Sequence, residues 1–221
     1  MVSRVMVLTL GFDEKFAIRA LTRAAPSSGD EVLVVMPSES DERVEKALDY
    51  LRRFCNIMDF PLEVEKVPVE KPEEAIAMIY KRLSQRLRGG KKLYLNLSGG
   101  MRALVLEVLA AAIAIARQWP SSMVETKVEV ELENFKNVIE LTLGHFSLSL
   151  PGSIDLEVLR SIKKLQASGE ATLDTIASEA KIPRSTTYRR LLDLKGRGYV
   201  RAEKRGRKVV YSLTELGEMW A

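Results

Sequence analysis

The 221-residue sequence has one cysteine, Cys55, and one histidine, His145. A single cysteine excludes an intramolecular disulfide and favours a reducing cytoplasm. The histidine has no second histidine or cysteine beside it with which to share a metal ion. We therefore expect no metal site, a structural role for His145, and a core position for Cys55 on the apolar stripe of a helix.

The sequence also lacks a long apolar run without charges. The most apolar stretch, residues 101–119, carries Glu107 in its middle, which favours a buried helix over a membrane span. The apolar run at the N-terminus is interrupted by Arg4 and followed by two acidic residues, unlike a signal peptide. We expect a cytoplasmic protein with no membrane partner.

Two familiar phosphate-binding motifs are missing. No G-x-x-x-x-G-K-[ST] occurs, and no G-x-G-x-x-G follows the first expected strand. Their absence argues against ATP hydrolysis and dinucleotide redox chemistry, so we expect no cofactor.

Positive charge is unevenly distributed. Residues 1–150 contain 20 Lys and Arg against 21 Asp and Glu, whereas residues 151–221 contain 14 against 9. The chain is long enough for two domains with separate cores, and Pro151-Gly152-Ser153 marks a boundary between them. We expect a nearly neutral domain over residues 1–150 and a polyanion-binding domain over residues 151–221.

The first 150 residues alternate between short apolar runs and segments with a helical apolar stripe. Strands are expected at residues 5–8, 31–36, 62–67 and 91–97, each followed by a helix. This alternation predicts an α/β fold with a mostly parallel, Rossmann-like sheet that has helices on both faces. The helix at 101–119 is apolar nearly all round, so we expect it to be buried between the sheet and another element, such as a second subunit.

A β-hairpin is expected at the C-terminal end of this sheet. Residues 128–132 and 139–143 alternate apolar and polar side chains around a short polar turn. Glu129, Glu131 and Glu133 share one face of the first hairpin strand, and we expect that face to be solvated.

A phosphate-binding turn is expected where the fourth strand ends. Ser98-Gly99-Gly100 leads into a helix, and such a turn presents backbone N–H groups at the positive end of that helix. Asn96 and Ser98 add hydrogen-bonding groups, and Arg102 adds a charge. Open α/β sheets bind ligands beyond the carboxyl ends of their strands. The alternative is a plain strand–helix turn in which Ser98 caps the helix.

Residues 151–221 are predicted to form an all-α/winged helix-turn-helix domain. Three helices are expected: one at 154–167, one that begins after Thr172 as its N-cap, and one at 184–195. A hairpin with a basic tip follows them. In the helix at 184–195, the side chains expected to pack into the core of the domain are Tyr188, Leu191, Leu192 and Leu194.

The helix at 184–195 and the hairpin tip carry the side chains that suit duplex DNA. Hydroxyls and arginine forks read base edges and hold phosphates, and a basic wing fits flanking phosphates or a minor groove. The expected DNA contacts are Arg184, Ser185, Thr186, Thr187, Arg189, Arg190, Lys204, Arg205, Arg207 and Lys208. The alternative is a winged helix that binds protein.

These strings resemble known families. Leu173-x-x-Ile-Ala-x-x-Ala, Ile182-Pro183 and Arg-Ser-Thr-Thr-Tyr-Arg-Arg-Leu-Leu resemble the winged helix-turn-helix of MarR- and ArsR-like regulators. Asn-x-Ser-Gly-Gly-x-Arg at residues 96–102 resembles the motif after the fourth strand of the CRISPR-associated Rossmann-like (CARF) domain, whose other ligand loop corresponds to Thr9–Asp13. The whole chain resembles the Csa-type transcriptional regulators of archaeal CRISPR systems.

The resemblance implies a homodimer that binds a cyclic oligoadenylate, cyclic tetra-adenylate in particular, and a palindromic duplex DNA. The ligand residues that it implies are Leu10, Gly11, Phe12, Asp13, Asn96, Ser98, Gly99, Gly100, Met101 and Arg102. Some CARF proteins cleave their own ligand, but no general base is evident near these residues, so we expect a binder without catalytic residues. A metabolite-responsive regulator outside CRISPR biology and a ring nuclease remain the alternatives.

Overall fold

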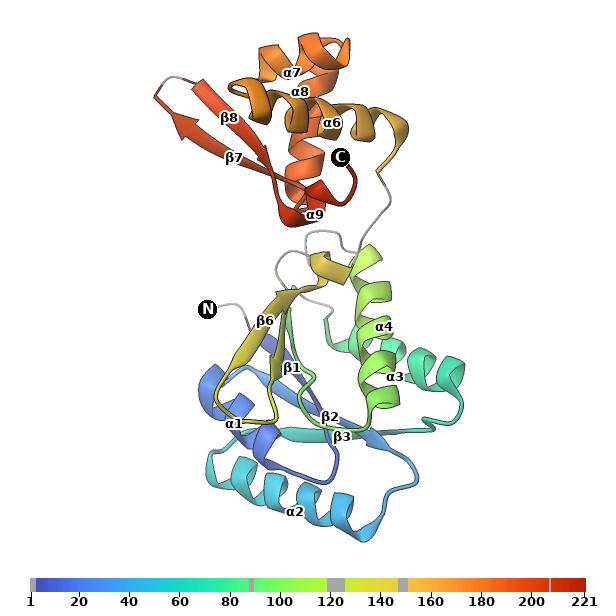
Figure 1. Cartoon of the computed structure of the whole chain (residues 1–221). Coiled ribbons are helices and arrows are strands. Elements are labelled where there is room, and N and C mark those ends of the chain that lie inside the picture. The colour runs from blue at the N-terminus through green and yellow to red at the C-terminus, as the bar shows by residue number, and fades with distance from the viewer. Residues whose placement is uncertain (1–2, 88–89, 119–125, 147–150, 207) are drawn as a thin grey trace. The chain divides into compact units, whose positions relative to one another are not determined.

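The computed structural model describes residues 3–87, 90–118, 126–146, 151–206 and 208–221, except for the side chain of His145. The chain forms two compact units, Met1–Phe146 and Ser147–Ala221, which are described separately (Figure 1). Within the described residues, no helix combines the length and the apolar character that a membrane crossing requires.

The first unit is built on a six-stranded sheet. Its strand order is β3-β2-β1-β4-β5-β6, in which β1 to β5 pair in parallel and β6 pairs antiparallel with β5. The strands are β1 (Arg4–Thr9), β2 (Glu31–Pro37), β3 (Leu62–Val67), β4 (Lys92–Asn96), β5 (Lys127–Glu131) and β6 (Val138–Thr142). This arrangement confirms the predicted Rossmann-like sheet with its C-terminal hairpin.

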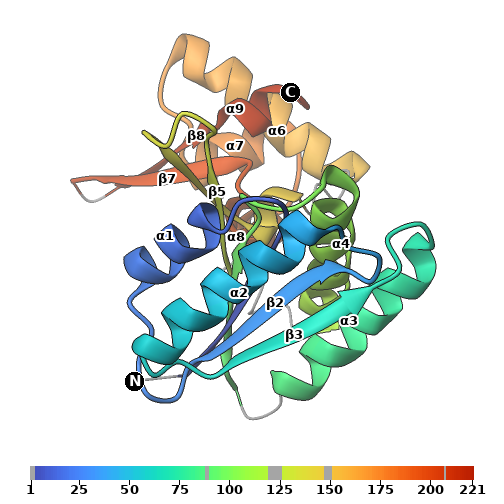
Figure 2. The same ribbon diagram turned by 90° about the horizontal axis from the view of Figure 1, so that it is seen from below.

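Helices cover both faces of this sheet, as Figure 2 shows. The helical segments are α1 (Lys15–Ala24), α2 (Glu42–Ile57), α3 (Pro72–Arg86), α4 (Arg102–Gln118) and the 3-10 turn η1 (Leu143–Phe146). Because side chains alternate along a strand, Met6 and Leu8 of β1 pack with α1 and α2, while Val5 and Val7 pack with α3 and α4. Cys55 is buried in the first of these cores, and burial raises the pKa of its thiol to about 11.

Helix α4 is not buried all round. Leu104, Val108 and Ile115 are buried against the sheet and α3, but Leu106 is 64% exposed. The prediction that α4 is buried on every side is therefore not met within this single chain.

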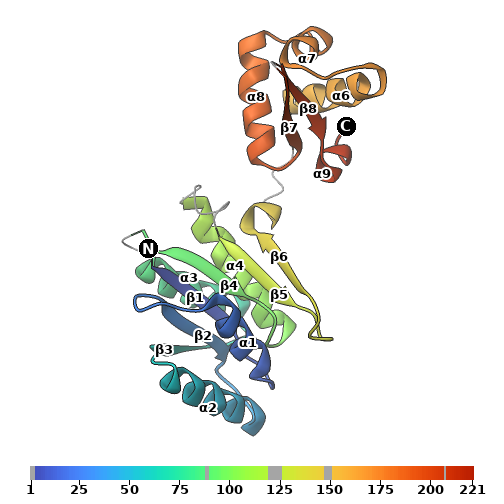
Figure 3. The same ribbon diagram turned by 90° about the vertical axis from the view of Figure 1, so that its left-hand side faces the viewer.

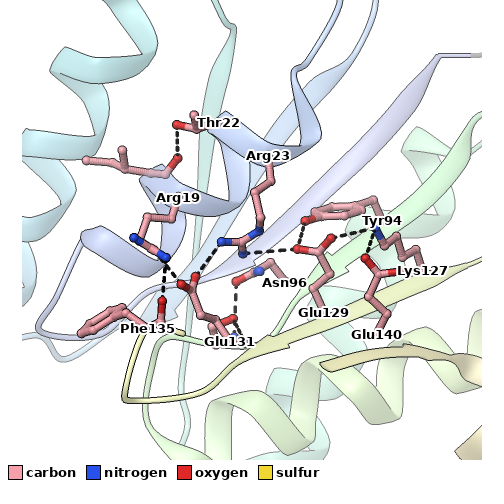
Figure 4. A network of polar contacts seen from close by, with 12 residues as sticks. Arg19, Thr22, Arg23, Tyr94, Asn96, Lys127, Glu129, Glu131, Phe135 and Glu140 are labelled. Carbon is pink, nitrogen blue, oxygen red and sulfur yellow. Dashed lines mark hydrogen bonds and ion pairs between the residues drawn. The ribbon is translucent and has the colours of Figure 1, made fainter. Parts of the chain in front are cut away.

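Strand β5 corrects the prediction of a solvated acidic face. Glu129 and Glu131 are buried, because that face of β5 lies under helix α1. Arg19 and Arg23 of α1 pair with them, so the burial of the carboxylates is offset by opposite charges (Figure 4). Central strands of an α/β sheet are covered on both faces, and period-two alternation alone does not reveal this.

The second unit combines helices with a two-stranded hairpin (Figure 3). Its elements are α6 (Ser153–Ser168), α7 (Leu173–Ala180), α8 (Arg184–Gly196), β7 (Val200–Arg205), β8 (Lys208–Leu213) and α9 (Glu215–Glu218). Thr172 caps α7 as predicted, because its side chain accepts a hydrogen bond from the Thr175 amide. A three-residue turn that begins at Lys181, whose φ is 55°, joins α7 to α8 and confirms the winged helix-turn-helix.

Candidate ligand pocket and nucleic-acid interface

The two expected ligand loops lie side by side at the point where the strand order reverses. Strands β1 and β4 are neighbours, so the loops that follow their carboxyl ends meet at one edge of the sheet. A Cβ atom at Gly11 would lie 2.9 Å from the backbone nitrogen and Cα of Gly100. Glycine at position 11 is therefore needed for the two backbones to touch.

The second loop is also fixed to strand β1 itself. The Thr9 hydroxyl donates to the Gly99 carbonyl at 2.6 Å, and a Cβ atom at Gly99 would lie 2.7 Å from the Thr9 carbonyl oxygen. Gly100 has a φ of +84°, which disfavours any residue with a side chain. Both glycines of the turn are thus required by close approach or by backbone conformation.

A pocket of about 330 Å³ opens between these loops. It is lined by Leu10, Gly11, Phe12, Asp13, Phe16, Pro37, Val44, Ser98, Gly99, Gly100, Met101 and Glu133. Eight of the ten residues that the resemblance implies belong to this lining. Helix α4 begins at Arg102, directly after the pocket, and the N–H groups of a first helical turn have no partners within the helix. The pocket can therefore offer donors to an anion.

Two of the ten expected residues do not line the pocket. Asn96 is only 1% exposed, and its Oδ1 accepts a hydrogen bond from the Ser98 amide, so it shapes the loop from below instead of facing a ligand. Arg102 is exposed at the start of α4, outside the lining.

Ser98 does not cap helix α4. It lies four positions before the first helical residue, and its Oγ accepts a hydrogen bond from the Glu131 amide of β5 at 2.8 Å. The predicted alternative of a Ser98 cap is therefore wrong, and the serine instead joins the loop to the neighbouring strand.

Four lining residues were not predicted from the sequence, namely Phe16, Pro37, Val44 and Glu133. Pro37 ends β2, which pairs in parallel with β1, so its place at the carboxyl end of a predicted parallel strand could have indicated it. Phe16 stacks on Phe135 with ring centroids 4.9 Å apart, and no sequence pattern relates these two positions.

The pocket mixes an exposed aromatic ring with acidic groups. Phe12 is 59% exposed, and the Arg43 guanidinium lies 4.1 Å from its ring centre. Asp13 and Glu133 place carboxylates in the same lining. Such a site suits a ligand that has an aromatic base and hydroxyl or amino groups beside its phosphates.

Helix α8 presents the basic face of the second unit. Arg184, Ser185 and Arg189 are exposed on it, and Lys204, Arg205 and Lys208 are exposed on the β7–β8 wing. The Arg184 guanidinium pairs with Asp174 of α7 at 2.5 Å while remaining 67% exposed. Thr186 and Arg190 are half-buried, and Arg190 lies 3.6 Å from Asp155. Arg207, also an expected contact, lies outside the described residues.

The structure corrects three assignments on α8. Thr187 was expected to be exposed, but it is fully buried, and its hydroxyl lies 3.2 Å from the Pro183 carbonyl oxygen at the start of the helix. Tyr188 and Leu192 were expected in the core, but they are 47% and 51% exposed. The core needs only one side of the helix, and Thr187, Leu191 and Leu194 occupy it.

Tyr188 is the clearest addition to the candidate nucleic-acid interface. It lies one position before Arg189 and close to Tyr211 of β8, whose pKa is raised by burial and by the Tyr188 phenol. An exposed tyrosine within a basic helix face is a signal that the sequence contained, but its apolar ring favoured a core assignment.

Comparisons with known proteins divide the chain in the same way. Residues 4–142 match the model of the Csa3 CRISPR-associated Rossmann-like domain, and residues 160–216 match the sugar-specific transcriptional regulator TrmB. No curated protein is similar enough to count as a match.

Solved structures resemble about a third of the chain. The PcaV transcriptional regulator of Streptomyces coelicolor is 24% identical over 31% of this chain and 48% of its own, with a TM-score of 0.27. BpsR of Bordetella bronchiseptica is 22% identical over 34% of this chain and 60% of its own, with a TM-score of 0.28. The chain thus spans less than two thirds of either protein.

The match at residues 4–142 covers more than half of the chain and fits the sheet and loops described above. The match at residues 160–216 fits the helix-turn-helix and its wing. The chain therefore belongs to the Csa3 CRISPR-associated Rossmann-like domain family, and its C-terminal winged helix-turn-helix is similar to that of the sugar-specific transcriptional regulator TrmB.

Proposed function

We propose that this protein is a transcriptional regulator that binds duplex DNA and controls CRISPR–Cas genes in response to a cyclic oligoadenylate, namely cyclic tetra-adenylate. The ligand binds at the pocket between the β1–α1 and β4–α4 loops, and the winged helix binds a palindromic promoter site. The chain acts as a ligand sensor and DNA-binding protein without catalytic residues of its own.

The packing of Gly11 against Gly100 is the observation that supports this proposal most. It brings two loops that are almost 90 residues apart to one pocket at the start of α4. Adenine can stack on the exposed Phe12 ring, phosphate oxygens can accept from the first turn of α4, and ribose hydroxyls can donate to Asp13 or Glu133. Each part of an adenosine phosphate thus has a matching group.

The size of the pocket supports a dimeric site. A volume of about 330 Å³ is at the small end of ligand pockets, and four nucleotides need more room. A two-fold symmetric ligand on a two-fold homodimer uses each pair of loops twice. We propose that two protomers share one cyclic ligand, each holding half of it.

Calorimetric titration of the full-length protein is expected to show one cyclic tetra-adenylate bound per two chains. Linear tetra-adenylate is expected to bind at least about tenfold more weakly, because an open chain must be ordered on binding. Equal affinities for the two ligands, or one ligand per chain, would contradict the proposed site.

Replacing Arg189 with alanine is expected to weaken DNA binding about tenfold and to reduce the slope of log affinity against log salt by about one. The reason is the loss of one exposed cation from the helix that faces the phosphates. Arg160→Ala is the matched control, because Arg160 is also exposed but lies on α6. Gel-shift titrations at several salt concentrations measure both quantities, and equal effects of the two substitutions would contradict an interface on α8.

A further inference from the structure

Helix α1 and the turn between β5 and β6 form one wall of the pocket. Phe16 of α1 and Glu133 of the turn both line it. The Phe16 ring stacks on Phe135 of the same turn, and the Arg19 guanidinium lies 5.5 Å from the Phe135 ring centre. The turn and the helix therefore meet beside the proposed ligand.

Beside this contact lies an Arg–Glu cluster, formed by Arg19 and Arg23 of α1 with Glu129 and Glu131 of β5 (Figure 4). The glutamate side chains are buried, whereas those of Arg19 and Arg23 are 47% and 30% exposed. The Arg19 Nε donates to Glu131 at 2.6 Å, and its Nη2 donates to the Phe135 carbonyl at 3.0 Å. Arg23 donates to Glu131 at 2.8 Å and to Glu129 at 3.3 Å. The cluster thus attaches α1 both to strand β5 and to the turn that follows it.

The same stretch of β5 holds the second ligand loop. The Leu97 amide donates to the Glu129 carbonyl at 2.9 Å, and the Glu131 amide donates to the Ser98 hydroxyl at 2.8 Å. The two glutamates therefore bind α1 through their side chains and the β4–α4 loop through their backbones. Since α1 continues from the β1–α1 loop, one cluster connects both ligand loops.

The cluster is charged. Burial alone would lower the pKa of the Arg23 guanidinium, but its hydrogen bonds and charge interactions with Glu131 and Glu129 raise it. Burial alone would raise the pKa of Glu129, but hydrogen bonds from Tyr94 and Lys127 lower it. Removal of an arginine leaves a buried carboxylate without its opposite charge, so the geometry that the cluster fixes depends on the arginines.

We propose that Arg19 and Arg23 are positioning residues for the ligand pocket, which hold its two loops and the β5–β6 turn in one binding geometry without touching the ligand. This inference rests on the proposed function. It assigns a role in ligand affinity to side chains that lie outside the pocket lining.

The chain offers a matched control at the opposite end of β1. The Arg4–Asp30 pair is 2.7 Å long with side-chain exposures of 30% and 1%, and the Arg23–Glu131 pair is 2.8 Å long with exposures of 30% and 0%. Arg4 begins β1, whereas the pocket follows its last residue. Arg4→Met and Arg23→Met therefore break ion pairs of similar length and exposure, one at the start of β1 and one beside the pocket. Arg4 also donates to the Ala24 and Ala25 carbonyls at the end of α1, and Arg23 also pairs with Glu129.

Both substitutions are expected to lower the melting temperature, but only Arg23→Met is expected to weaken cyclic tetra-adenylate binding. The expected loss of affinity is about tenfold or more, which is the size of effect seen when residues that support metal ligands are replaced. Arg23→Lys is expected to recover part of the affinity. Titrations are carried out on the full chain at a temperature where each variant remains folded. Wild-type affinity in Arg23→Met, or an equal loss in Arg4→Met, would overturn the proposal.

Hydrogen exchange provides a readout that needs no ligand. In Arg23→Met, the amides of Leu97 and Glu131 are expected to exchange faster than in the wild type, and in Arg4→Met they are expected to stay unchanged. If the wild type binds no cyclic tetra-adenylate, the proposed ligand is wrong, but this comparison still decides the positioning role. Unchanged exchange in Arg23→Met would overturn it.

Discussion

Gly99→Ala is expected to abolish ligand binding and to destabilise the first unit. The new Cβ would lie 2.7 Å from the Thr9 carbonyl oxygen, which is a backbone atom in the central strand of the sheet and cannot rotate away. Overpacking of this kind costs about 1–3 kcal/mol, or a decrease of about 3–10 °C in the melting temperature of a domain of this size. The Thr9–Gly99 hydrogen bond must also lengthen, which moves the pocket wall.

Gly29→Ala serves as the control for this change. A Cβ atom there would meet only the Ser3 Cβ at 3.7 Å, an ordinary contact, so stability and ligand affinity are expected to stay close to those of the wild type. Calorimetric melting and ligand titration of the two variants measure the difference. A Gly99→Ala protein that binds and melts like Gly29→Ala would show that the loop is not fixed against β1.

Tyr188→Ala is expected to reduce affinity for the specific DNA site about tenfold to a hundredfold, with a much smaller change on random DNA. An exposed tyrosine on the helix that is proposed to enter the major groove can contact a thymine methyl group or donate to a base edge, and such contacts contribute about 1–3 kcal/mol of discrimination. Tyrosine carries no charge, so the salt dependence is expected to stay unchanged. Arg189→Ala, in contrast, is expected to change that dependence.

Tyr188→Phe separates the ring from the hydroxyl. If the ring packs on a methyl group, the phenylalanine variant keeps the specificity of the wild type; if the hydroxyl reads a base edge, it behaves like Tyr188→Ala. Binding to the operator and to a scrambled duplex of equal length, at several salt concentrations, distinguishes these cases. Equal losses on both duplexes would show that Tyr188 contributes no sequence recognition.

The sheet was predictable because its strands are short apolar runs separated by helices with one apolar stripe. The meeting of the two loops was also predictable, since strands that flank the switch point of such a sheet place their carboxyl ends together. The contacts that hold those loops together were not predictable from the sequence. Glu129 and Glu131 follow the alternation of a half-exposed strand, and only the position of α1 above them shows that their face is covered.

Helix α8 shows the same limit on a smaller scale. Threonine is polar and tyrosine is largely apolar, so residue type alone predicts that Thr187 lies on the surface and Tyr188 in the core. The structure reverses both, because α8 turns Leu191 and Leu194 toward the core, and Thr187 lies on that same side of the helix whereas Tyr188 does not. Arg19 and Arg23, spaced one helical turn apart, could have indicated a paired acidic strand, but the sequence does not identify which strand.

The two units each have a separate core, and the family matches respect that division. One match ends at residue 142 and the other begins at residue 160, so neither match crosses the boundary between the units at residues 146 and 147. A joint of this kind is where recombination between genes does the least damage, because the packing on either side survives the exchange. In evolutionary terms, the Rossmann-like unit can be joined to a different C-terminal domain, and the winged-helix unit to a different N-terminal domain, without either having to be rebuilt.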